Sequence, residues 1–103
     1  MSDDNYIVLK GWMVNRLNLK GNELIAYALI YGFSQDESSW FQGSIGYIAK
    51  GMGVTKNSAR NSLKKLQKKG LIERNEEESG GIKIVKYRAV FPEVEGYPKK
   101  LRG

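Results

Sequence analysis

The stretch Ser44–Ile72, SIGYIAKGMGVTKNSARNSLKKLQKKGLI, decides the fold of this chain. Ser44 is a preferred helix N-cap residue, and the apolar residues after it have the i, i+3, i+4 spacing of one buried helix face: Ile45, Ile48 and Ala49. Gly51 and Gly53 are expected to break this first helix, because glycine is a poor helix former. The side chain of Val54 then fills the corner between this helix and the next.

The second half of the stretch predicts a longer helix over residues 55–69. Thr55 is its N-cap residue, and the apolar side chains recur at i, i+4, i+7, as Ala59, Leu63 and Leu66. Gly70 supplies the left-handed residue that ends the helix, and a strand begins at Leu71. Two short helices joined by a tight glycine turn are the pattern of a helix-turn-helix.

Positive charge gathers on the same stretch. Residues 50–74 hold eight lysines and arginines against Glu73 alone, whereas the rest of the chain has nine basic and ten acidic residues. The net charge of +6 therefore comes from this element, as expected of a nucleic-acid-binding surface. The alternative explanation of this charge is a solvated lysine-rich helix face that binds no ligand. The candidate contact residues here are Ser44, Thr55, Lys56, Asn57, Ser58, Arg60, Asn61 and Lys64.

Composition excludes several other classes of function. A chain of 103 residues with 41% apolar content supports one small domain, and it has no apolar run long enough to span a bilayer. The absence of cysteine and histidine excludes disulfides, a Cys/His zinc site and histidine chemistry. The adjacent carboxylates Asp36 and Glu37 are expected to be solvated in a polar loop. We therefore expect a cytoplasmic, non-enzymatic protein without cofactor, metal or membrane association.

The segments before the helix-turn-helix predict an N-terminal arm with a short helix over residues 1–18 and a central helix from Leu19 to Phe33. The central helix is apolar nearly all round, so it is either buried in the domain or shared with a second copy in a homodimer. A short strand over Trp40–Gln42 leads into the helix start at Ser44.

The segments after it predict a β-hairpin. Leu71–Asn75 and Ile82–Phe91 are β-rich runs, and Glu76–Gly81 between them has the composition of a turn. A helix-turn-helix followed by a hairpin is a winged helix, so the predicted fold is α+β, with a three-helix core and a C-terminal wing over residues 19–91. Residues 92–103 are expected to form an extended basic tail.

The motif segments Val54–Ala59, Leu63–Leu66 and Lys69–Ile72 resemble the winged helix-turn-helix of bacterial regulators. Further segments extend the resemblance over about residues 5–91, namely Gly11–Met13, Leu19–Leu24, Ala28–Ser34 and Phe41–Ser44. Together they are similar to a family from low-GC Gram-positive bacteria, their phages and mobile elements. Some members of that family look like the N-terminal domains of phage or plasmid replication proteins.

The resemblance implies a double-stranded DNA-binding module with the 55–69 helix in the major groove, acting in transcription regulation or in replication initiation. Thr55 would contact phosphate, Lys64 would reach the backbone, and the residues facing base edges would be Lys56, Asn57, Arg60 and Asn61. Carboxylates at the wing tip would repel phosphates. We therefore expect any wing contact on the hairpin flanks, at Arg74, Lys83 or Lys86, rather than at the tip. The alternative is a winged helix used as a protein–protein interaction module, through the acidic wing and the aromatic-rich first helix.

Overall fold

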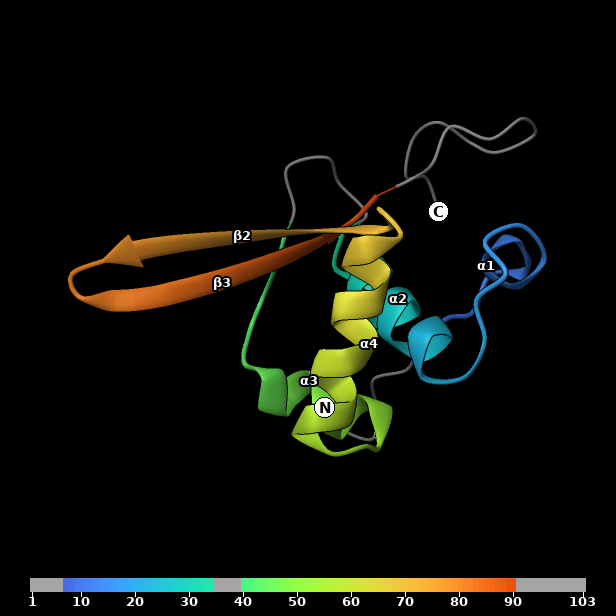
Figure 1. Cartoon of the computed structure of the whole chain (residues 1–103), viewed down its shortest axis with the longest axis horizontal. Helices are drawn as coiled ribbons and strands as arrows, with labels where there is room; N and C mark the ends of the chain where they lie inside the picture. The colour runs from blue at the N-terminus through green and yellow to red at the C-terminus, as the bar shows by residue number, and fades with distance from the viewer. Residues whose placement is uncertain (1–6, 35–39, 91–103) are drawn as a thin grey trace.

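A computed structural model describes residues 7–34 and 40–90 and shows helices with a projecting hairpin (Figure 1). The elements are α1 (Gly11–Asn15), α2 (Gly21–Gly32), β1 (Phe41–Gln42), α3 (Ile45–Met52), α4 (Lys56–Lys68), β2 (Ile72–Ser79) and β3 (Ile82–Ala89). This is the α+β winged helix that the sequence predicts. The expected basic tail, the first six residues and the loop carboxylates Asp36 and Glu37 lie outside the described residues.

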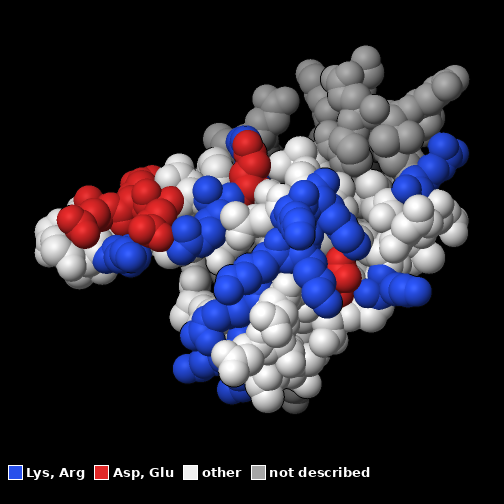
Figure 2. All heavy atoms as spheres, in the orientation of Figure 1, with Lys and Arg blue, Asp and Glu red and all other residues white. Residues whose placement is uncertain are grey.

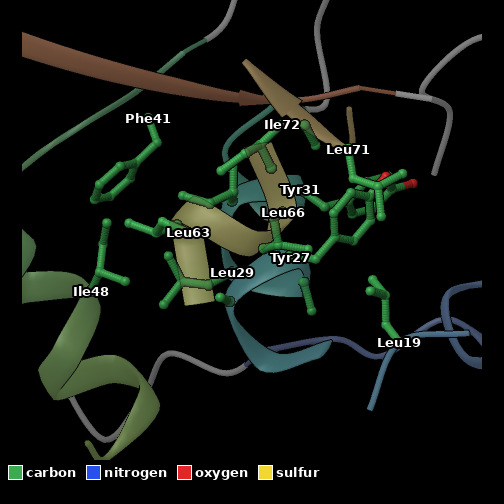
Figure 3. Close-up of a cluster of buried hydrophobic side chains, with 14 of the residues drawn as sticks. Leu19, Tyr27, Leu29, Tyr31, Phe41, Ile48, Leu63, Leu66, Leu71 and Ile72 are labelled. Atoms are coloured by element: carbon green, nitrogen blue, oxygen red, sulfur yellow. The ribbon is translucent and has the colours of Figure 1, made fainter. Parts of the chain in front are cut away.

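The core forms where α2 packs against the apolar face of α4. Residues Ala26–Tyr31 of α2 are all buried within this one chain, which confirms α2 as the central helix of the domain. Figure 3 shows the buried side chains converging from the helices and the strand ends, among them Tyr27, Leu29, Tyr31, Phe41, Ile48, Leu63, Leu66, Leu71 and Ile72. Within the described part of the chain, no helix combines the length and apolar composition that crossing a membrane requires.

Side-chain hydrogen bonds cap the N-termini of both helices of the helix-turn-helix. The Tyr47 backbone N–H donates to the Ser44 hydroxyl at 3.1 Å, and the Ser58 backbone N–H donates to the Thr55 hydroxyl at 3.2 Å. Both side-chain caps confirm the sequence prediction. The prediction that Gly51 breaks α3 is wrong, because α3 continues through Gly51 to Met52. The reversal occurs only at Gly53, whose φ of 74° is costly for residues with a Cβ atom.

The sheet has the order β1-β3-β2 and is antiparallel throughout. The sequence places the glutamates of the wing in its turn, and this prediction is wrong. Strand β2 continues to Ser79, so Glu76–Glu78 are paired across from Lys83–Val85 of β3. Gly80 and Gly81 alone make the turn, with φ of 57° and 80°. A two-residue turn with positive φ at both positions matches the strand twist, so it extends the ladder over the glutamates.

Two buried hydroxyls attach the end of β3 to α2. The Ser34 hydroxyl donates to the Ile30 carbonyl at 2.8 Å and accepts from the Ala89 backbone N–H at 3.1 Å. The Tyr27 hydroxyl donates to the Val90 carbonyl at 3.1 Å, and burial raises the pKa of this phenol well above its usual value. These bonds fix where the wing leaves the helical body.

Replacing Ser34 with alanine tests this attachment. Ser34→Ala leaves the buried Ala89 N–H without a partner, so the free energy of unfolding in a urea titration should fall by about 1–3 kcal/mol. The control Ser79→Ala removes an exposed hydroxyl near the wing tip and should change it by less than about 0.5 kcal/mol. Equal effects of the two substitutions would contradict the role of Ser34.

Candidate nucleic-acid interface

The outward face of α4 is exposed and cationic. Because its apolar stripe is buried against the core, the side chains of Lys56, Asn57, Arg60, Asn61 and Lys64 all face solvent. Figure 2 shows Lys and Arg side chains over α4 and toward the base of the wing. Within residues 7–34 and 40–90, no carboxylate is within ion-pair distance of Lys56, Arg60 or Lys64. The helix therefore presents uncompensated positive charge.

An open groove of about 600 Å³ lies between α4, the start of α3 and the wing. It is lined by Gly43, Ser44, Ile45, Arg60, Leu63, Lys64, Gln67, Arg74, Lys83, Val85 and Tyr87. Four of these residues are cations predicted from the sequence as contact residues, namely Arg60, Lys64, Arg74 and Lys83. Their convergence requires the hairpin to fold back beside α4, because Arg74 and Lys83 are far from Arg60 along the chain.

Sequence reasoning missed two polar residues of this groove. Gln67 follows Lys64 by three positions, so the helical spacing that identified Arg60 and Lys64 also predicts Gln67 on the same side. Tyr87 became visible only through strand pairing, which sets it opposite Arg74. Its hydroxyl interacts with the Arg74 guanidinium, and this contact, followed by that of Glu76, raises the pKa of Arg74.

Arg60 is oriented by its neighbour one turn earlier. The Arg60 Nη1 donates to the Asn57 Oδ1 at 3.1 Å, and both side chains are exposed. The guanidinium has five N–H donors, so most of them stay available for a ligand. Arginine donors in a fixed fork suit the paired acceptors of guanine or a phosphate.

Ser58 and Asn61 lie on the other side of α4, away from the groove. They line a smaller polar hollow of about 350 Å³ together with Lys20, Asn22, Glu23, Ser62 and Lys65. Ser58 is half-buried, and its hydroxyl accepts from the Thr55 hydroxyl at 3.1 Å. The predicted contact residues of α4 are thus divided between two sides of the helix.

The predicted contact residues of the wing also lie on two different faces of the hairpin. Arg74 and Lys83 lie on the face that lines the groove, whereas the strand register sets Lys86 on the opposite face. Of the three predicted wing contacts, Lys86 is thus the one that faces away from the groove. Its Nζ pairs with Glu77 at 3.1 Å, on the face it shares with the pair between Arg88 and Glu73.

Glu76 bridges the two groove-facing cations of the wing. Its Oε1 is 2.9 Å from the Arg74 Nη2, and its Oε2 is 3.4 Å from the Lys83 Nζ. These neighbours, Arg74 first, lower the pKa of the Glu76 carboxyl below its usual value. The described residues contain no group of three or more acidic, histidine or cysteine side chains arranged to hold a metal ion.

A family model described as a helix-turn-helix domain matches residues 17–72. The chain belongs to this helix-turn-helix family. The matched span covers α2, β1, α3, α4 and the first residue of β2, so it contains the cationic helix but not the hairpin. No curated protein sequence matches the chain.

Two solved structures share the fold of this helix-turn-helix protein. One is described as a possible transcriptional regulator from Methanosarcina mazei Go1, with 16% identity and a TM-score of 0.56 over 85% of this chain and 77% of that chain. The other is described as the N-terminal domain of a DNA-binding protein, with 17% identity and a TM-score of 0.61 over 90% of this chain and 79% of that chain. At these identities the likeness concerns the fold.

The N-cap residue Thr55 is expected to stabilise the start of α4. Thr55→Ala removes the hydroxyl that accepts from Ser58, so the free energy of unfolding should fall by about 1 kcal/mol in chemical denaturation. Thr55→Ser keeps a capping hydroxyl and serves as the control that should retain most of the stability. A Thr55→Ala protein as stable as the parent would show that the cap contributes nothing.

Proposed function

We propose that this chain is a double-stranded DNA-binding module that inserts α4 into the major groove. The observation that carries the proposal is the exposed face of α4, whose cations have no carboxylate partner among the described residues. An α-helix fits the major groove of B-DNA, and lysine and arginine side chains release counterions when they contact phosphates. The module has no catalytic role.

Within this proposal, the residues of α4 have different tasks. Asn57, at the first turn, holds Arg60, and the free donors of Arg60 read base edges. Lys56 and Asn61 extend this exposed face on either side, and Lys64 contacts the phosphate backbone. Ser44 at the start of α3 and Thr55 at the start of α4 approach phosphates, because helix N-termini present unpaired backbone N–H groups.

As the biological role we propose transcription regulation or replication initiation for a phage, plasmid or other mobile element. Both roles use the same interface on duplex DNA, and the fold does not distinguish them. Selection of binding sites from a random duplex library would separate them by where the sites occur. A palindromic site would further indicate that two copies bind together.

The protein–protein alternative is not favoured by the positions of the aromatic side chains. It relied on the acidic wing together with an aromatic surface on the first helix of the domain, but Tyr27 and Tyr31 are buried in the core. Trp40 is half-buried, with the Arg88 guanidinium 4.6 Å from its ring centroid.

Mobility-shift titrations with a selected duplex, repeated over a salt series, test the proposed function. Arg60→Ala should weaken binding by about 1–3 kcal/mol and relax base preference at one position, because its bidentate donors are lost. Lys64→Ala should weaken binding to all duplexes by the same factor and reduce the slope of log K against log salt by about 0.9.

Lys10→Ala is the matched control, since Lys10 lies at the start of α1, outside the groove. It should bind DNA as the parent does. Failure of the parent protein to bind any duplex at low salt would overturn the proposed function.

A further inference from the structure

The carboxylate of Glu76 compensates both wing cations of the groove at once. Each of its two oxygens is in contact with a different cation, Arg74 or Lys83. Among the described residues, Glu76 is the one carboxylate paired with any of the four cations that line the groove. Arg60 and Lys64 on α4 keep their charge uncompensated, so the two sides of the groove differ.

The bridge is open to the ligand side. The side chains of Arg74, Glu76 and Lys83 are 36%, 40% and 61% exposed, so none is sealed from solvent. Exposed ion pairs are weak and easily exchanged, because water screens them. A backbone phosphodiester carries one negative charge on two free oxygens, which is the same charge and a similar fork to that of a carboxylate.

We propose that Glu76 holds Arg74 and Lys83 in the free protein as a stand-in for a DNA phosphate, and that it is the residue setting how strongly the wing contributes to duplex affinity. This inference rests on the proposed DNA-binding function and adds a residue to it. A phosphate entering the groove exchanges with Glu76 at the two cations. Because the phosphate has to displace Glu76 from both cations, the wild-type wing adds little affinity.

The inference concerns affinity and not base choice. Arg74 and Lys83 lie on the wing, and contacts to phosphate carry no sequence information directly. Removal of the Glu76 charge should therefore strengthen binding to unrelated duplexes by the same factor. Base preference, which the proposed function assigns to α4, should not change.

The chain offers a matched control on the other face of the same hairpin. Glu77 pairs with Lys86 at 3.1 Å, and neither residue lines the groove. Glu77→Gln changes the net charge by the same amount as Glu76→Gln and breaks an ion pair of the same kind. Glu76→Gln frees two cations on the groove face, whereas Glu77→Gln frees one cation on the opposite face.

The experiment is a mobility-shift titration of the parent 103-residue chain and its Glu76→Gln and Glu77→Gln variants with one selected and one unrelated duplex. Glu76→Gln should tighten binding to both duplexes about fivefold at low salt, because the phosphate no longer has to displace an exposed carboxylate from the two cations. For this variant, the slope of log K against log salt should steepen by about 0.9, as expected for one added phosphate contact. Glu77→Gln should stay within about twofold of the parent because exposed pairs contribute little.

A second background isolates the mechanism. Adding Glu76→Gln to a protein that already carries Arg74→Gln and Lys83→Gln should give no gain, because the cations that Glu76 holds are gone. A gain that persists there, equal gains for Glu76→Gln and Glu77→Gln, or no gain at all for Glu76→Gln would overturn the inference. Thermal melting by circular dichroism verifies that every variant is folded.

Heparin separates failure of this inference from failure of the proposed function. On a heparin column, Glu76→Gln should elute at higher salt than Glu77→Gln, because heparin is a polyanion that needs no base recognition. If no duplex binds but Glu76→Gln still elutes at higher salt than Glu77→Gln, the proposed function fails. The conclusion that Glu76 restrains the wing cations then stands. If duplexes bind the parent and the two variants elute together, the inference fails and the proposed function stands.

Discussion

The packing of one apolar stripe of α4 against α2 is the constraint on which the rest of the structure depends. Ala59, Leu63 and Leu66 are almost completely buried, and Leu66 lies near the centre of the core in Figure 3. A helix that buries this stripe has its opposite side fixed toward solvent. Because Arg60 and Lys64 are on the exposed side of the helix, packing of the apolar stripe also exposes the cationic surface.

The wing is positioned by hydrogen bonds as much as by apolar contact. Ser34 and Tyr27, both on or next to α2, bond the backbone at the end of β3. On the other edge of β3, β1 pairs Phe41 with Tyr87 and so connects the hairpin to the segment that leads into α3. The hairpin is therefore held from two sides at its base, and the groove beside α4 has a defined wall.

Electrostatics differ between the two walls of that groove. The α4 wall has cations without acidic partners, whereas the wing wall has Arg74 and Lys83 bridged by Glu76. The glutamates also lie on β2, which is an edge strand of the sheet. Charged side chains on an exposed edge oppose pairing with another chain. Glu76 and its neighbours thus oppose edge-to-edge association of the sheet, and Glu76 also offsets the charge of Arg74 and Lys83.

The sequence by itself determined the helices, their caps and the cationic face, because these depend on residues that are close along the chain. Helical spacing predicted the burial of Leu63 and Leu66 and the exposure of Arg60, and capping chemistry identified Ser44 and Thr55. Each of these features involves neighbours within about one or two helical turns.

Only the tertiary structure decided which of those cations share a site. Strand register is set by the turn at Gly80 and Gly81 and by pairing between segments, and a shift of one residue would move each side chain to the other face. That register assigns Lys83 to the groove and Lys86 to the opposite face. It likewise brings Glu76 between Arg74 and Lys83, a contact that depends on the three-dimensional pairing of two strands.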